Sequence, residues 1–156
     1  GLKYEDIAFT YSILPYAKKI SYVPIGMYYY VQHANSLINH QTGKVRDIFS
    51  IIDNVINFYK KNKLYKKYND ELEYLAVKIL LGSSFYRILG IEDKTLRKTI
   101  VKENWLYLNN NFPKWRANKY FRKIKKVRNI CYAYLTNNIT YNLAAVAYRL
   151  KSRLSK

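Results

Sequence analysis

The sequence is poor in several features that would define its class. Cys131 is the only cysteine among 156 residues, which excludes an intrachain disulfide and favours a reducing, cytosolic location. No run approaches the roughly 18 apolar residues that a helix needs to cross a bilayer. A Gly-rich phosphate loop, a repeat of fixed period and a low-complexity linker are also absent. What remains is the length and composition of one globular domain.

Acidic residues are also few, and they are unevenly placed. The chain holds 28 Lys or Arg against 10 Asp or Glu, for a net charge of +18. Glu103 is the last acid, so the final 53 residues contain twelve basic and no acidic side chains. A surface of that sign attracts polyanions, namely nucleic acid, anionic lipid headgroups or nucleotide-linked substrates. Charge by itself does not choose among the three.

Apolar residues recur at helical spacing over most of the chain. The pattern predicts helices over about 4–19, 48–59, 70–90, 93–112, 120–131 and 139–154. Two short strands are expected at Ile20–Val23 and Met27–Gln32, on either side of a Pro24-Ile25-Gly26 turn. The predicted fold class is therefore mainly α, a helical bundle with a short N-terminal helix and a two-strand β segment.

For some side chains within these helices the sequence also predicts which face or packing role they take. Tyr86 continues the stripe of the helix that we expect to begin at Asp70. Trp105 and Trp115 are expected to anchor helix packing rather than to form sugar platforms. In the last helix one face carries a stripe of aliphatic residues, namely Ile139, Leu143, Val146, Ala147, Leu150 and Leu154.

Glu5 and Asp6 form an adjacent carboxylate pair ahead of an aromatic segment that leads to His33 and Ser36. A carboxylate is the usual base for chemistry at a sugar hydroxyl, so this layout suits a sugar site. Adjacent helical residues point about 100° apart, which gives the two acids distinct roles. The alternative is that both are first-turn acids favoured by the helix dipole.

The ordered motifs closely resemble the end of the catalytic domain in bacterial family 2 glycosyltransferases, inverting GT-A enzymes that build capsules and other surface polysaccharides. The matching residues are Tyr4-Glu5-Asp6, Phe9, Leu14, Ala17-Lys18-Lys19-Ile20, Tyr28-Tyr29-Tyr30 and Ser36-Leu37. Residues 112–120 look like a segment in the helical tails of many such enzymes. The resemblance implies that residues 1–39 are the C-terminal edge of the catalytic domain and that 40–156 form a helical C-terminal domain.

The resemblance also implies roles for individual residues. Asp6 matches the base that takes the proton from the acceptor hydroxyl, and Glu5 would orient the acceptor or tune Asp6. His33 would contact the donor diphosphate, directly or as a metal ligand, or it would be a surface-loop histidine. Ser36 would touch the acceptor or the diphosphate, or cap the following turn, and Tyr30 is assigned to the same acceptor and diphosphate site.

The family's Asp-x-Asp metal motif belongs to an amino-terminal α/β half, and no Asp-x-Asp occurs here. We therefore expect a C-terminal fragment of a glycosyltransferase that binds the donor poorly and transfers no sugar alone. The full-length enzyme would use a nucleotide sugar, a saccharide or lipid-linked acceptor, and a divalent metal, Mg²⁺ or Mn²⁺. No cofactor is expected in the fragment alone.

The basic tail suits the surface of an anionic membrane, which predicts a cytoplasmic protein held peripherally at the inner face of the cell membrane. The residues assigned to that surface are Arg122, Lys123, Lys125, Lys126, Arg128, Arg149 and Arg153. A solvated basic face is the plain alternative. The other candidates are a basic helical module that binds nucleic acid and a structural interaction domain, although no helix-turn-helix or RNA-binding motif is present.

Overall fold

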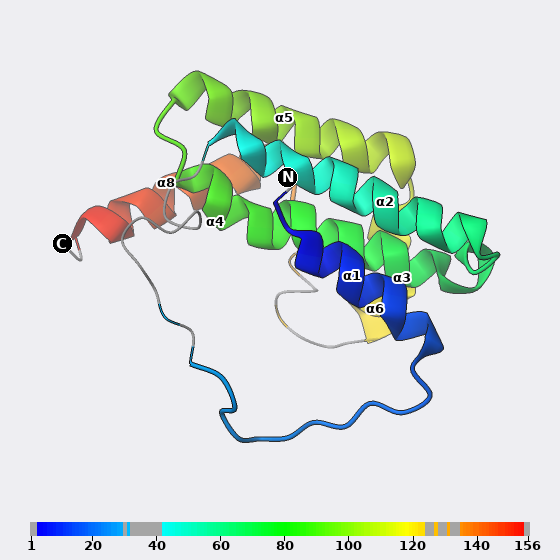
Figure 1. The fold of residues 1–156 in the computed structure, drawn as a ribbon. Coiled ribbons are helices and arrows are strands. Elements are labelled where there is room, and N and C mark those ends of the chain that lie inside the picture. The colour runs from blue at the N-terminus through cyan, green and yellow to red at the C-terminus, as the bar shows by residue number, and fades with distance from the viewer. Residues whose placement is uncertain are drawn as a thin grey trace.

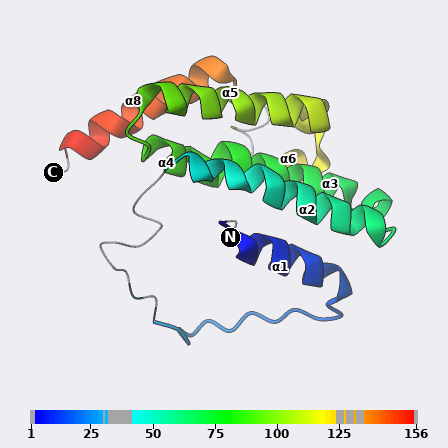
Figure 2. The ribbon, with the colours of Figure 1, turned by 45° about the horizontal axis from the view of Figure 1, so that its top comes forward.

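The computed structural model describes residues 3–29, 31, 42–123, 127, 131 and 135–154. These residues form helices joined by turns and one extended segment (Figure 1), which confirms the mainly α fold class. Helices α2 (Asp47–Lys61), α3 (Tyr65–Val77) and α4 (Ser84–Leu89) make a central layer. Figure 2 shows α1 (Glu5–Ile13) on one side of this layer and α5 (Lys94–Asn111) on the other.

Helix α2 (Asp47–Lys61) forms the centre of the core, as its periodicity predicts. It follows a 3-10 turn, η2 (Gly43–Arg46), in which the Thr42 side chain accepts a hydrogen bond of 3.3 Å from the backbone amide of Lys44. The helix ends at Lys61, and Lys63 then takes a left-handed conformation with φ 59°. Its apolar stripe is buried: Ile48, Ile51, Ile52, Val55, Ile56 and Tyr59.

Three consecutive elements continue the chain as one helical rod: α3 (Tyr65–Val77), the π-helical segment η3 (Lys78–Ser83) and α4 (Ser84–Leu89). The predicted start at Asp70 was wrong by five residues, although a kink at Tyr68 (φ −115°, ψ 18°) separates the first turn from the rest.

The π-helical segment also overturns the expected burial of Tyr86. A π turn is wider than an α turn, so it rotates every later residue around the rod. Ser84 and Ile88 are buried as a result, whereas Tyr86 is 59% exposed.

Helix α5 (Lys94–Asn111) begins and ends where the sequence predicts. The carboxylate of Asp93 caps it by accepting from the backbone amides of Thr95 at 2.7 Å and Leu96 at 3.1 Å. The chain then turns through Pro113 and the 3-10 turn η4 (Trp115–Ala117) into α6 (Lys119–Lys123).

The turn after α5 is built into the core. Trp115 is only 2% exposed and packs 6.4 Å from Trp105 between ring centroids, so the predicted packing role of the two indoles is confirmed. Asn118 is also buried, and its side-chain amide donates to the Asp70 carbonyl and to a Glu73 carboxylate oxygen, each at 2.7 Å. The segment that resembles a glycosyltransferase tail therefore has a clear structural role.

Helix α1 (Glu5–Ile13) continues into the 3-10 turn η1 (Leu14–Tyr16), which accommodates Pro15. The hydroxyl of Tyr59 on α2 donates a hydrogen bond of 2.9 Å to the carbonyl of Tyr11. At the other end of α1, the backbone amide of Lys3 donates to a carboxylate oxygen of Asp47 at 3.0 Å. Both ends of α1 are thereby attached to α2.

After η1 the chain runs away from the helices as an extended segment (Figure 1). The described residues of the two expected strands, 20–23 with 27–29 and 31, form no strand in this structure. A lone two-strand hairpin is marginal in water unless a further strand or a helix covers it, which gives a physical reason for the difference.

Helix α8 (Asn138–Leu154) packs across α4 through aromatic contacts. Tyr141 meets Phe85 with ring centroids 4.8 Å apart, and Tyr148 meets Tyr86 at 5.3 Å. Tyr141 and Ala145 are buried against the bundle. This inner face fixes which side of α8 looks outward.

Candidate functional site

The carboxylate pair opens α1. Glu5 and Asp6 occupy the first turn of the helix, and both are exposed. The residue before them, Tyr4, has φ 71° and ψ 28°, a left-handed conformation that is uncommon for any residue other than glycine. Such backbone costs on the order of 1–3 kcal/mol and tends to cluster at functional sites. The strain therefore lies immediately beside the two predicted catalytic acids.

Tyr4 is held in this conformation by its surroundings. The guanidinium of Arg87 on α4 lies 4.2 Å from the centre of the Tyr4 ring, and the Tyr4 carbonyl accepts from the Ile7 backbone amide at 3.1 Å. Burial raises the pKa of the Tyr4 hydroxyl. The packed ring fixes the direction in which Glu5 and Asp6 leave the bundle.

The rest of the predicted sugar site cannot be placed beside this pair. Tyr30, His33 and Ser36 lie outside the described residues, so only Glu5 and Asp6 of the expected set are located. In the part of the chain that the structure describes, no group of three His, Cys, Asp or Glu residues is placed to hold a metal ion.

The extended segment that follows α1 exposes an unusual amount of apolar surface. Its exposed large side chains are Ile20, Tyr22, Val23, Ile25, Met27, Tyr28, Tyr29 and Val31. Tyr29 is 94% exposed, and Phe9 on α1 adds a further exposed ring. Contiguous exposed apolar surface marks a place where another surface binds. We call residues 20–29 and 31 the uncovered segment.

The structure describes the backbone of four of the seven residues that we assign to a membrane surface. Arg122 and Lys123 end α6, and Arg149 and Arg153 lie four residues apart on α8. The other three, Lys125, Lys126 and Arg128, fall outside the described residues. Of the helices that the structure describes, none is long and apolar enough to cross a membrane.

Helix α8 has a second apolar face, opposite the one that packs on α4. Its exposed members, which we call the outer stripe, are Ile139, Leu143, Val146 and Leu150. Their spacing of four, three and four residues places them on one side of the helix, as the sequence predicts. The sequence of α8 contains Arg149, Lys151 and Arg153 and no acidic residue.

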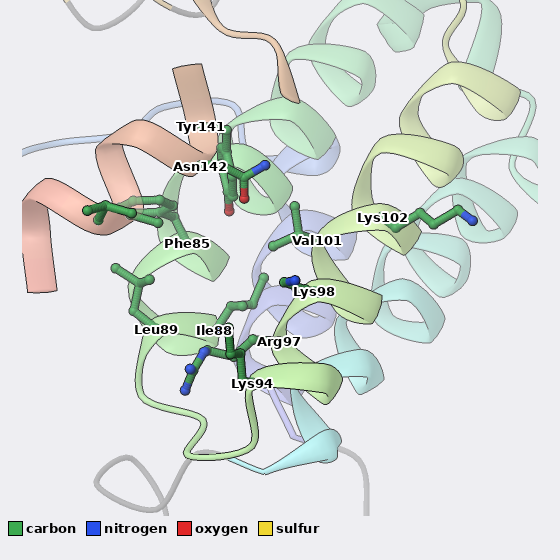
Figure 3. A pocket seen from close by; sticks show the side chains of 12 residues that line it. Phe85, Ile88, Leu89, Lys94, Arg97, Lys98, Val101, Lys102, Tyr141 and Asn142 are labelled. Carbon is green, nitrogen blue, oxygen red and sulfur yellow. The ribbon is translucent and has the colours of Figure 1, made fainter. Parts of the chain in front are cut away.

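A cavity of about 580 Å³ lies between α4, α5 and α8, and sequence reasoning missed it. Figure 3 shows α4 contributing Phe85, Ile88 and Leu89, with Tyr141 and Asn142 facing them from α8. The cations that line it all come from α5, namely Lys94, Arg97, Lys98 and Lys102. Their spacing of three and four residues was visible in the sequence. The apolar floor was not, because it depends on how α8 crosses α4.

Comparisons with known proteins supply no relative. No protein-family model, no curated protein and no solved structure matches the chain.

Proposed function

We propose that the chain is the C-terminal portion of a family 2, GT-A-type inverting glycosyltransferase, with Asp6 as the catalytic base. The observation that carries this proposal is the exposed Glu5-Asp6 pair, held after a strained Tyr4 and followed by the uncovered segment. These acids are free to meet a substrate. The apolar surface of that segment, which leaves the other end of α1 after η1, favours a covering body, a role that the donor-binding α/β half of such an enzyme would fill.

The reaction assigns one proton transfer to this chain. Asp6 accepts the proton of the acceptor hydroxyl while that oxygen attacks the anomeric carbon of the nucleotide sugar. The bond from that carbon to the diphosphate breaks, and the nucleoside diphosphate leaves with the electron pair. Because the attack comes from the face opposite the leaving group, the configuration inverts. Glu5, about 100° away on the first turn, is assigned to hold the acceptor.

The resemblance assigns charge stabilisation at the leaving diphosphate to His33, with Tyr30 and Ser36 nearby. It also implies a divalent ion, Mg²⁺ or Mn²⁺, in the whole enzyme. The described residues offer no ligand set that fits such an ion, so we assign no step to it.

We assign a two-strand β structure to the uncovered segment when it adds to the sheet of the donor-binding half. Support comes from its composition and exposure, since Tyr22, Val23, Tyr28 and Tyr29 favour strands and are exposed here. Pairing with a neighbouring sheet edge would bury these side chains and give the backbone N–H and C=O groups hydrogen-bond partners.

The helical domain would hold the enzyme at the inner face of the cell membrane. The outer stripe of α8 supports this, because it is an exposed apolar face on a helix whose charged residues are all basic. A basic side chain near an anionic bilayer contributes roughly 1 kcal/mol, and buried apolar area adds to it. A saccharide acceptor carried on a lipid would then be presented to Asp6 at that surface.

The direct test is turnover by the natural protein that contains this chain. The purified protein is incubated with nucleotide sugars and membrane extracts, and release of nucleoside diphosphate is measured. The proposal predicts release that depends on both donor and acceptor. If the natural protein neither binds nor consumes any nucleotide sugar, the proposal is wrong.

A further inference from the structure

The cavity between α4, α5 and α8 combines an apolar floor with a basic rim. Its volume of about 580 Å³ is within the usual range of roughly 300–1,000 Å³ for small-molecule sites. The floor consists of Phe85, Ile88, Leu89, Val101, Ala145 and Val146, and none of the described residues that line the cavity is acidic. A ligand that fits both parts must be apolar along its body and negatively charged at one end.

Two lysines of the rim are available to such a charge. Lys94 and Lys98 are exposed and lie one helical turn apart, so their side chains neighbour each other along α5. Among the described residues, neither forms an ion pair. Lys102 continues the row, but Figure 3 shows its amine directed away from α4 and α8. Lys94 and Lys98 are therefore the residues that can meet an anion at the mouth.

Arg97 lies between these lysines in sequence and is partly buried. One of its terminal nitrogens donates to the backbone carbonyls of Ile91 and Glu92, the latter at 2.8 Å. Its Nε is buried and finds no hydrogen-bond acceptor among the described residues. A buried charged donor without an acceptor is unfavourable, and an anionic oxygen of a ligand would offset that cost.

The cavity also borders the outer stripe of α8. Val146 belongs to both, and Asn142 lines the cavity one turn before it. The outer stripe and the cavity therefore meet at Val146, where an apolar chain can contact both. This continuity, together with the charge of the rim, identifies the occupant.

We propose that this cavity binds a phosphate-bearing anionic lipid, with the phosphate at Lys94, Arg97 and Lys98 and the hydrocarbon chain on the floor. A free phosphate would leave the floor empty. A nucleic-acid backbone has no apolar chain to place there, and the two rings of the lining, Phe85 and Tyr141, pack edge-to-face against each other at 4.8 Å between centroids. The site is distinct from the Glu5-Asp6 pair, and its occupancy does not depend on sugar transfer.

The test is direct binding of a short-chain lipid that stays monomeric. Dihexanoyl phosphatidic acid is titrated into the protein and binding is followed by calorimetry. Inorganic phosphate and dihexanoyl phosphatidylcholine serve as the headgroup-only and zwitterionic arms. The double variant Lys94→Gln/Lys98→Gln removes the two positive charges at the mouth of the cavity. The control variant Lys61→Gln/Lys66→Gln removes the same amount of charge from exposed positions on α2 and α3.

We expect phosphatidic acid to bind at least about tenfold more tightly than either comparison ligand. The Lys94/Lys98 variant should lose at least about tenfold in affinity, and the Lys61/Lys66 variant should bind as the wild type does. Circular dichroism checks that both fold. Equal binding by the two variants overturns the proposal, as does inorganic phosphate binding as tightly as the lipid. A single-stranded oligonucleotide that displaces the lipid at equal concentration would assign the rim to nucleic acid instead.

Discussion

The side-chain amide of Asn104 donates a hydrogen bond of 2.9 Å to the backbone carbonyl of Leu80, and both residues are fully buried. Leu80 lies in the π-helical segment η3, where the wide turn disturbs the regular ladder of backbone hydrogen bonds. A buried carbonyl without a partner is costly, so a polar side chain is retained in the core to meet it. This pair attaches α5 to the central rod.

Replacing Asn104 with leucine should therefore lower the free energy of unfolding by about 1–3 kcal/mol, although leucine is apolar and similar in size. Urea unfolding followed by circular dichroism measures the change. Asn109→Leu, an exposed position on the same helix, is the matched control and should change stability by less than about 0.5 kcal/mol. Equal losses in the two variants would show that the Asn104 contact has no special role.

Arg46 and Glu103 join η2 to α5 through two parallel hydrogen bonds, Nε to Oε2 at 2.7 Å and Nη2 to Oε1 at 2.9 Å. Both side chains are about one third exposed, so the pair should contribute no more than roughly 1 kcal/mol. Arg46→Lys should lose most of that contribution, because lysine cannot form both bonds. A double-mutant cycle with Glu103→Gln, repeated in 1 M salt, measures it. A coupling energy that salt leaves unchanged would contradict this account.

Alkaline pH should destabilise the fold through Tyr59. Burial raises the pKa of Tyr59 to about 12, against about 10 for an unfolded tyrosine. Its contribution is therefore complete below pH 10 and is lost as the pH rises towards 12, because the unfolded chain ionises first. The free energy of unfolding should fall by up to about 1.4 kcal/mol per pH unit for this group.

The variant Tyr59→Phe should flatten that slope between pH 10 and 12, measured by urea unfolding at each pH. Tyr22, which is 88% exposed, supplies the control Tyr22→Phe. If both variants keep the wild-type slope, Tyr59 does not carry the effect.

Much of the fold could be predicted from the sequence because its signals are local. The apolar stripe of α2, the Asp93 cap and the stop at Pro113 each depend on residues within a few positions of one another. The π-helical segment could not be predicted from local sequence. Its buried Leu80 carbonyl takes a hydrogen bond from the side chain of Asn104, which lies 24 residues later in the chain. The burial of Ser84 in place of Tyr86 follows from that unpredicted turn.

The candidate sites also differ in how far they could be predicted from the sequence. Glu5 and Asp6 were identified by resemblance, and the structure adds the strained Tyr4 and the exposure of both acids. Their catalytic role and the division at residues 39 and 40 stay predictions. The cavity could not be predicted because its lining joins residues of α4 and α8 that are some 56 to 60 positions apart, such as Phe85 with Tyr141 and Ala145.

Binding to membranes should follow the charge of the tail. Replacing Arg122, Lys123, Lys125 and Lys126 with glutamate should abolish co-sedimentation with anionic vesicles, and neutral vesicles should bind neither protein. The control makes the same change at four lysines of the α2–α3 end, Lys60, Lys61, Lys66 and Lys67. Vesicle binding by the tail variant at the level of the wild type would refute the membrane assignment.

The exchange of one carboxylate tests the central claim most directly. In the natural protein, Asp6→Asn should lower the rate of sugar transfer by about a hundredfold to ten-thousandfold, the usual contribution of a general base, while donor binding changes less than about twofold. Asp93→Asn is the matched control, because asparagine also caps a helix, and it should keep the wild-type rate. A transfer rate for Asp6→Asn equal to that of Asp93→Asn would contradict the assignment of Asp6 as the base.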